Sequence, residues 1–121
     1  MNADLQLDLE RLPGALVARP QGDIDMAVAP RIERTVIDAV ARHRPACVLV
    51  DLSAVTYIDS SGIRLLFRLY SSLAEDPSRL VVVAPPGSSA ARLLGLVALG
   101  DIGDVRPSVE SALEACQGPA L

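Results

Sequence analysis

The sequence predicts an α/β domain: a mixed sheet of four to five strands that opens with a hairpin and is packed with about four helices. Two short apolar runs, residues 47–50 and 80–83, show no alternation, which is typical of strands covered on both faces. Segments with apolar residues at helical spacing lie between and after these runs. A hairpin followed by alternating helices and strands implies a mixed sheet with helices packed on it.

The first part of the chain supplies the hairpin and a helix. Leu5, Leu7 and Leu9 alternate with polar residues, the period of a half-buried strand. Pro13-Gly14 predicts a turn, residues 15–18 a second strand and residues 21–25 a loop. A helix is expected next, with Pro30 in its first turn, where a missing N–H does no harm. Pro45 lies just beyond the end of this helix. Its apolar positions have helical spacing (Ile32, Val36, Ile37 and Val40).

The second part of the chain continues the alternation of strands and helices. Asp51 ends the strand at 47–50 and is expected to accept hydrogen bonds there. A second helix is predicted from about Gly62 to Leu73, before the strand at 80–83. Ser88 or Ser89 can cap a third helix. The third helix is expected to end near Leu96. A short strand around Val105 and a last helix from about Val109 to Cys116 are expected after it.

Composition narrows the possible roles. The chain has 121 residues without a break in composition, which predicts one domain, 1–121. A formal charge of −4 argues against a nucleic-acid partner, which would require a basic surface. Neither a signal peptide nor a membrane span is predicted, because no suitable apolar run is present. We therefore expect a cytoplasmic protein in which Cys47 and Cys116 are reduced, buried or partly buried thiols.

The segment Asp59-Ser60-Ser61-Gly62 directly precedes the second predicted helix. Asp and Ser are preferred at helix N-termini because their oxygens accept hydrogen bonds from the first backbone N–H groups. On local signals alone, a structural cap is the simplest interpretation. A cap does not require an acid, two hydroxyls and a glycine in succession, so a functional site is the alternative.

The second helix carries more apolar residues than one face needs. One stripe can dock it on the sheet (Ile63, Leu66, Phe67, Tyr70 and Leu73). Leu65 and Leu69 are then expected on another side, beside Arg64 and Arg68. Such an apolar strip next to two cations is typical of a partner surface. The alternative is a helix wedged between the sheet and a neighbouring helix.

The segment that contains the serine pair resembles a known family. The run VLVDLSAVTYIDSSGIRLL at residues 48–66 resembles the central signature of STAS domains, in particular of bacterial anti-sigma factor antagonists. Gly22-Asp23-Ile24-Asp25 is similar to the family's loop after the second strand, and residues 108–113 are similar to its C-terminal helix. One departure is Val97-Ala98-Leu99, where the family usually carries Thr-Gly-Leu.

The resemblance implies a STAS-like fold and a partner switch without a cofactor. By position, Ser60 is the residue phosphorylated by an anti-sigma factor that is also a Ser/Thr kinase, and Ser61 is its neighbour. The unphosphorylated protein binds this kinase and frees a sigma factor; phosphorylation ends the binding, and a Ser/Thr phosphatase restores it. The residues expected to contact the partner are Asp23, Asp25, Asp59, Ser60, Ser61, Gly62, Ile63, Arg64, Leu65 and Arg68.

The position of Ser60 at a predicted helix N-terminus suits that role. A phosphoryl group adds about −1.5 to −2 charges, and a helix N-terminus tolerates an anion through its dipole and free N–H groups. A partner packed there would meet a desolvated dianion beside Asp59, so binding should fail while the fold survives. Asp23 and Asp25 are either partner contacts or ordinary turn acids.

Enzyme functions fit less well. Asp51 superficially resembles the acceptor of a receiver domain, but the chain has no Lys to contact the phosphoryl group. A serine hydrolase needs a general base, and the only histidine, His43, lies between two arginines at a predicted helix end. No Gly-x-Ser-x-Gly elbow, glycine-rich phosphate loop or zinc cluster is present. The remaining alternative is a non-switching STAS subunit of a membrane lipid-transport or stress-signalling complex.

Overall fold

The computed structural model describes residues 6–75, 78–95 and 104–117. Five strands form the main sheet in the order β1-β2-β4-β6-β7, in which β1 pairs with β2 antiparallel and the other pairs are parallel. The predicted mixed α/β fold is thereby confirmed. The elements are β1 (Leu7–Leu12), β2 (Ala15–Pro20), β3 (Gly22–Ile24), α1 (Ala29–His43), β4 (Cys47–Asp51), β5 (Val55–Ile58), α2 (Ser60–Glu75), β6 (Arg79–Val83), α3 (Ser89–Leu94), β7 (Asp104–Arg106) and α4 (Val109–Gln117).

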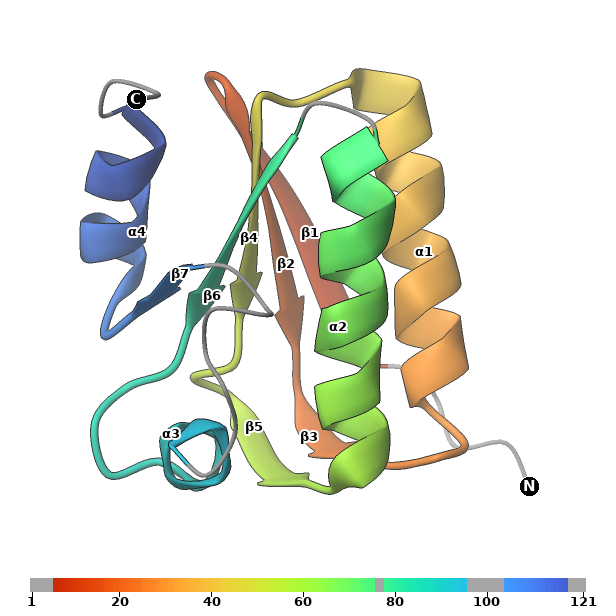
Figure 1. The fold of residues 1–121 in the computed structure, drawn as a ribbon, viewed down its shortest axis with the longest axis vertical. Helices are drawn as coiled ribbons and strands as arrows, with labels where there is room; N and C mark the ends of the chain where they lie inside the picture. The colour runs from red at the N-terminus through yellow and green to blue at the C-terminus, as the bar shows by residue number, and fades with distance from the viewer. Residues whose placement is uncertain (1–5, 76–77, 96–103, 118–121) are drawn as a thin grey trace.

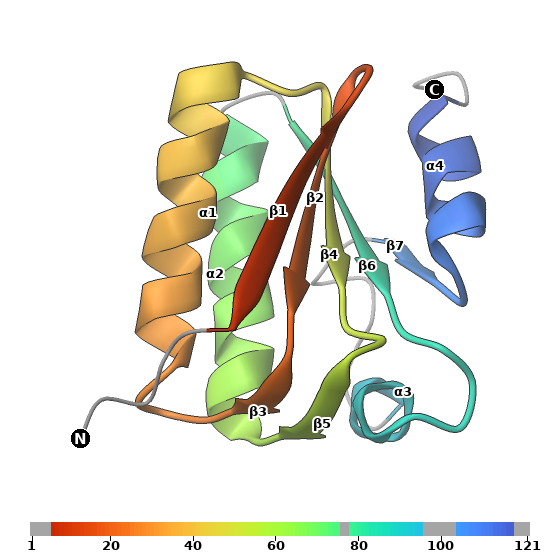
Figure 2. The ribbon, with the colours of Figure 1, turned by 180° about the vertical axis from the view of Figure 1, so that it is seen from behind.

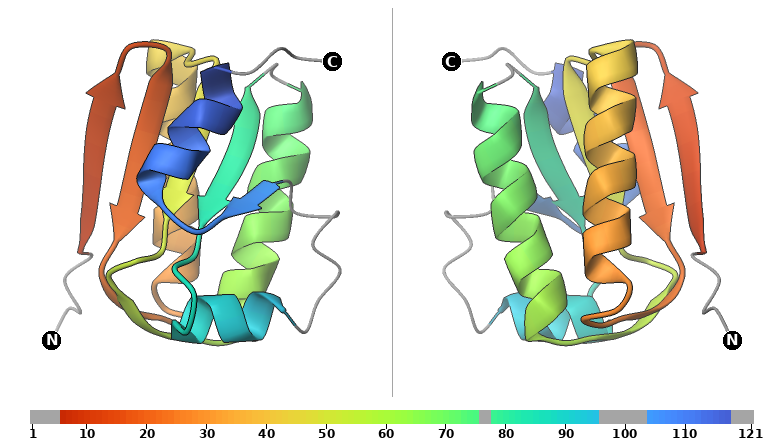
Figure 3. Two further views of the ribbon diagram at one scale, coloured as in Figure 1. Left: turned by 90° about the vertical axis from the view of Figure 1, so that its left-hand side faces the viewer. Right: turned by 90° about the vertical axis from the view of Figure 1, so that its right-hand side faces the viewer.

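Helices cover both faces of the main sheet. α1 and α2 lie side by side on one face, and α4 lies on the opposite face (Figures 1 and 2). The side views in Figure 3 show the same three layers. Alternate residues of the central strands therefore enter different cores: Val48 and Val50 pack beneath α1 and α2, whereas Leu49 packs beneath α4. This double coverage explains why the strand at 47–51 is apolar without alternation.

α1 follows its sequence signals closely. Pro30 lies in the first turn, and Ile32 and Val36 are fully buried against the sheet. The helix ends at His43, and Arg44 adopts a left-handed conformation (φ 48°) in which its N–H donates to the Val40 carbonyl at 2.8 Å. This is a common way for a helix to terminate.

α2 begins at Ser60, earlier than expected, and its buried face differs from the predicted one. Leu65 and Leu69 are 3% and 0% exposed, whereas Tyr70 is 38% exposed and Phe67 half-buried. The predicted exposed strip of Leu65 and Leu69 is therefore wrong. The reason is that α2 packs against α1 as well as the sheet, so its buried face is turned toward α1. The wedged-helix alternative is the correct one.

A second, two-stranded sheet lies at one end of the molecule, where the sequence predicted a loop. β3 and β5 pair in parallel, with Asp23 opposite Tyr57 and Ile24 opposite Ile58. Figure 1 shows this pair beside α3 and the beginning of α2. The backbone N–H of Asp59 donates to the Ile24 carbonyl at 3.3 Å. The small sheet therefore fixes where α2 starts.

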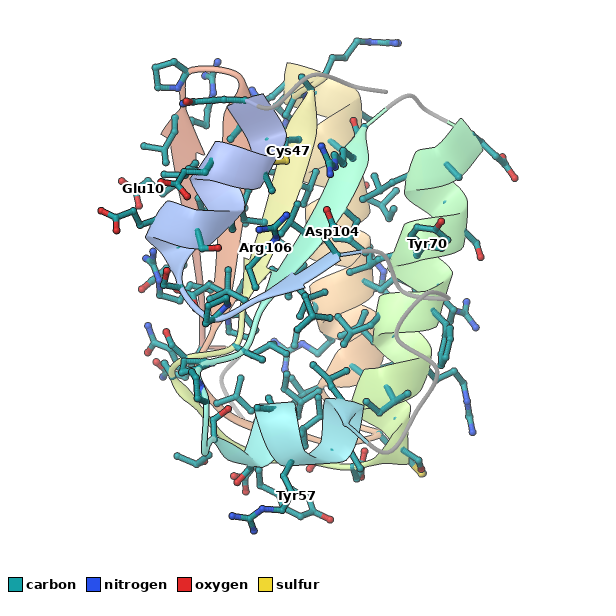
Figure 4. All side chains as sticks on the ribbon, turned by 60° about the vertical axis from the view of Figure 1, so that its left-hand side comes forward. Glu10, Cys47, Tyr57, Tyr70, Asp104 and Arg106 are labelled. Carbon is teal, nitrogen blue, oxygen red and sulfur yellow. A yellow bond between two sulfur atoms is a disulfide. The ribbon has the colours of Figure 1, made fainter. Side chains whose placement is uncertain are left out.

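Cys47 and Cys116 form a disulfide in the structure, which differs from the two separate, reduced thiols that the sequence predicted. Cys47 begins β4, and Cys116 lies in α4, which packs back over that face of the sheet. The two Cα atoms are 5.9 Å apart, a usual separation for a disulfide. Figure 4 shows the Cys47 sulfur beneath α4. A sequence separation of 69 residues concealed this proximity.

The later elements agree with the sequence. The Ser88 hydroxyl caps α3 by accepting a hydrogen bond from the Ala91 N–H at 3.1 Å. β7 includes Val105, and α4 runs one residue beyond its predicted end. The expected end of the third helix near Leu96 and the Val97-Ala98-Leu99 departure lie outside the described residues.

Candidate functional site

At the beginning of α2, Asp59 and not the serine pair caps the helix. Asp59 performs the capping: its Oδ1 accepts from the Ser61 N–H at 2.8 Å, and its carbonyl accepts from the N–H groups of Gly62 and Ile63 at 3.0 and 3.3 Å. Within residues 6–75, 78–95 and 104–117, neither serine hydroxyl has a hydrogen-bond partner. The side chain of Ser60 is exposed and that of Ser61 half-buried. The serines are therefore not needed to cap the helix.

Gly62 allows α2 to approach the small sheet closely. A Cβ placed on Gly62 would overlap the side chain of Ile58, coming within 2.6 Å of its Cδ1, and would lie 3.2 Å from Ile24 Cγ2. Gly62 and Ile63 are buried, while Ser60 faces outward. This close packing beneath Ser60 holds the backbone of the first turn of α2 in place.

Two hollows flank Arg64 on the surface of α2. One, of about 350 Å³, opens between α1 and α2, and the other, of about 300 Å³, opens between α2 and α3. Volumes of this size are at the small end of the range for ligand sites, and both hollows are open enough to receive partner side chains. The first is lined by Met26, Ala29, Pro30, Glu33, Ser61, Arg64, Leu65 and Arg68; the second by Ser60, Ile63, Arg64, Phe67 and Leu93.

Met26 is the most exposed large apolar side chain beside these hollows, at 75%. It follows β3 in the turn that leads into α1. Sequence reasoning missed Met26, since a single methionine in a polar segment gives no periodic signal. Tyr57, 54% exposed, extends from β5 at the same end of the molecule (Figure 4). Exposed apolar side chains gathered around two hollows are typical of an interaction surface.

Arg64 and Arg68 are both exposed but differ in their contacts. Arg68 Nε lies 2.9 Å from Glu33 Oε1, an ion pair that joins α2 to α1. Arg64 makes no ion pair or hydrogen bond with any residue that the structure describes. Of the two predicted cations, Arg64 is thus the one available to another charged group.

The two acids of the Gly22–Asp25 segment have different roles. Asp25 Oδ1 accepts hydrogen bonds from the N–H groups of Ala27 and Val28 at 3.0 and 3.1 Å, which stabilises the turn into α1. Asp23 is exposed on β3, and its Oδ1 accepts from the Thr56 hydroxyl at 2.9 Å. The turn-acid interpretation therefore describes Asp25 well, whereas Asp23 presents a carboxylate to solvent near the serine pair.

The serines have no histidine beside them. His43 ends α1 at the opposite end of the molecule from the beginning of α2 (Figure 1). Desolvation, together with the positive charges of Arg11 and Arg42, lowers the pKa of His43. In the described ranges no three His, Cys, Asp or Glu side chains are grouped to hold a metal. Among the described helices, none combines the length and apolar character needed to cross a membrane.

One relative is similar to this chain in sequence, and two solved structures share its fold. In sequence, the chain is similar to an anti-sigma F factor antagonist from Paenibacillus polymyxa, with 23% identity over 113 residues, 92% of this chain and 97% of the relative. In structure, it is similar to an anti-sigma factor antagonist from Mycobacterium paratuberculosis, with a TM-score of 0.84, 30% identity and coverage of 95% and 96% of the two chains. The Bacillus cell fate determinant SpoIIAA in its phosphorylated form shares the fold, with a TM-score of 0.68, 18% identity and coverage of 92% and 99%.

The family assignment agrees with the signature around the serine pair. The profile of the STAS domain family matches residues 6–112, which include both sheets, α1, α2 and the beginning of α4. The chain therefore belongs to the STAS domain family, among the bacterial anti-sigma factor antagonists.

Proposed function

We propose that this protein is a phosphorylation-controlled partner switch. In its unphosphorylated form it binds an anti-sigma factor with Ser/Thr kinase activity and thereby frees a sigma factor. Phosphorylation of Ser60 abolishes this binding, and a Ser/Thr phosphatase restores it. A single observation carries the proposal: Asp59 caps α2, which leaves the Ser60 hydroxyl exposed at a close-packed helix terminus and without a hydrogen-bond partner in the part of the chain that the structure describes.

Exposure supports Ser60 as the acceptor over Ser61. A kinase must bring the γ-phosphate of ATP into line with the hydroxyl oxygen, which requires open space around that oxygen. Ser60 is exposed, whereas Ser61 is half-buried in the hollow between α1 and α2. The Ser61 N–H is also held by the Asp59 carboxylate at 2.8 Å. Ser61 thus serves as the supporting neighbour.

The surroundings of Ser60 explain how one phosphoryl group would end binding. Ile63, Phe67 and Leu93 give the hollow beside Ser60 an apolar lining. A partner that inserts an apolar side chain there would meet about −1.5 to −2 charges next to Asp59. The protein itself loses no contact on modification, because the Ser60 hydroxyl has no partner among the described residues. Binding is therefore expected to fail without a change in fold.

The partner surface that we propose differs in part from the predicted one. Leu65 is nearly inaccessible, so the apolar contacts are assigned instead to Met26, Phe67 and Leu93. Arg64 lies between these residues and supplies positive charge. Asp23 marks the edge of the surface, and Asp25 acts by shaping the turn that carries Met26. Because an anti-sigma factor acts on transcription, we propose that this protein is located in the cytoplasm.

The acceptor is tested by incubating the protein with its cognate kinase and ATP and locating phosphate by peptide mass spectrometry. Ser61→Ala is the matched control because it removes the adjacent hydroxyl and leaves Ser60 in place. We expect phosphate on Ser60 in the wild type and in Ser61→Ala, and none in Ser60→Ala. Phosphate on Ser61 alone would contradict the assignment. Stable binding of the kinase without any phosphate would instead favour a constant docking role.

A further inference from the structure

The first turn of α2 offers fewer donors to a phosphoryl group than the sequence suggests. The N–H of Ser61 is already taken by the Asp59 carboxylate, and those of Gly62 and Ile63 by the Asp59 carbonyl. Asp59 also places a negative charge directly beside Ser60. A dianion on Ser60 therefore needs a positive partner other than the helix terminus.

Arg64 is placed to be that partner. It follows Ser60 by four residues in α2, and side chains at this spacing are neighbours on a helix surface. Both residues line the hollow between α2 and α3, whose other lining residues are apolar. Of the residues that the structure describes, Arg64 is the one charged residue that lines this hollow, and Asp59 directly precedes Ser60 in the chain. Arg64 has no competing acid among the described residues.

Arg68 provides the contrast. It lies one further turn along α2, and its guanidinium is held by Glu33 of α1 at 2.9 Å. It lines the hollow on the α1 side but not the hollow that contains Ser60. Two exposed arginines on one helix therefore differ in whether they are free to pair with a group on Ser60.

We infer that Arg64 is the internal counter-ion of phosphorylated Ser60. This rests on the proposal that Ser60 is the modified residue. The guanidinium donates charge-assisted hydrogen bonds to the phosphoryl oxygens, and such forked pairs are among the strongest polar contacts in proteins. Because Arg64 also lines the α1-side hollow, this pairing neutralises a cation that we assign to partner binding. Phosphorylation thus adds negative charge to the partner surface and occupies the guanidinium of Arg64 on that surface.

The inference is tested with phosphoserine installed at position 60 during translation, so that no kinase is needed. The ³¹P NMR shift is followed from about pH 4 to about pH 9, a range that spans the second pKa of phosphoserine near 6. With Arg64 present, we expect that pKa to lie about half a unit lower than in Arg64→Gln. Arg64→Lys should restore part of the shift, because a point charge remains without the planar fork.

Arg68→Gln is the matched control and should titrate like the wild type. Raising the salt to about 1 M should reduce the difference between wild type and Arg64→Gln. Equal pKa values in the wild type and Arg64→Gln, or an equal change in Arg68→Gln, would overturn the inference. Circular dichroism establishes that each variant is folded. Since the phosphoserine is installed directly, a failure here leaves the kinase assay on Ser60 unaffected, and the reverse also holds.

Discussion

Arg19 Nε donates to Oδ2 of the buried Asp51 at 2.9 Å and so ties the end of β2 to the end of β4. The other carboxylate oxygen accepts from the Ser53 N–H at 3.0 Å. The side chain of Asp51 is only 3% exposed, and that of Arg19 is 30% exposed. These contacts hold the turn that leads from β4 into β5 and then to Ser60. The expectation that Asp51 accepts hydrogen bonds at a strand end is confirmed.

Acid should weaken the fold through Asp51. Desolvation alone would raise the pKa of Asp51, but hydrogen bonds from Arg19 and Ser53 outweigh it and lower that pKa below its ordinary value. The associated stability is present above the unfolded-state pKa of about 3.9 and is lost as pH falls through the lower folded-state pKa. Urea unfolding at a series of pH values measures this loss. In Asp51→Asn we expect lower stability at neutral pH and a smaller decline in acid; an unchanged decline would contradict this role.

Gly62→Ala should destabilise the protein, although alanine usually favours a helix. The helical preference is worth about 1 kcal/mol, whereas overpacking against Ile58 and Ile24 costs about 1–3 kcal/mol. We therefore expect a net loss in the free energy of unfolding, measured by urea denaturation. Gly95→Ala is the control, because its added Cβ would lie 3.5 Å from the nearest atoms, an ordinary contact. A Gly62→Ala variant as stable as the wild type would show that α2 does not pack as closely as described.

Asp25 and Asp23 should differ in how much they contribute to the stability of the fold. Asp25→Ala removes the acceptor for two backbone N–H groups and should cost about 1 kcal/mol of stability. Asp23→Ala removes one exposed hydrogen bond and should change stability by less than about 0.5 kcal/mol. Thermal unfolding measures both effects. Equal losses for the two variants would refute the distinction.

The disulfide should contribute to stability by joining α4 to β4. It closes a loop of 69 residues, and cross-links of this kind typically add about 2–4 kcal/mol. The double variant Cys47→Ala/Cys116→Ala should unfold at correspondingly lower urea concentration than the oxidised wild type. Reduced wild type should behave like this variant. Because reducing cytosol keeps most thiols unpaired, the bond is expected to form in the cell only under oxidising conditions. Identical stability of oxidised and reduced protein would contradict the prediction.

The main elements of the fold could be predicted because each has a local signal. The apolar runs at β4 and β6, the Pro13-Gly14 turn and Pro30 at the beginning of α1 all act within a few residues. The β3–β5 pair could not be predicted in this way. β3 has three residues, too few to show a period, and its pairing depends on residues more than thirty positions later.

The place of the serine pair in the fold could be predicted from the sequence, but its surroundings could not. The serine pair and Arg64 lie at the exposed beginning of α2, as the family signature implied. The exposure of Leu65 and Leu69 was predicted wrongly because α2 is apolar on several sides, and only its packing against α1 decides which leucines are buried. Met26 and the disulfide depend on tertiary proximity, which no local pattern encodes.

The central claim is tested most directly by measuring, with titration calorimetry, how the cognate anti-sigma factor binds the protein before and after phosphorylation of Ser60. Ser60→Ala, which cannot be modified there, serves as the control and should bind with ATP present or absent. We expect the phosphorylated protein to bind at least about a hundredfold more weakly, with an unchanged circular dichroism spectrum. Equal affinity of the two forms, or a loss of binding that accompanies unfolding, would contradict the switch.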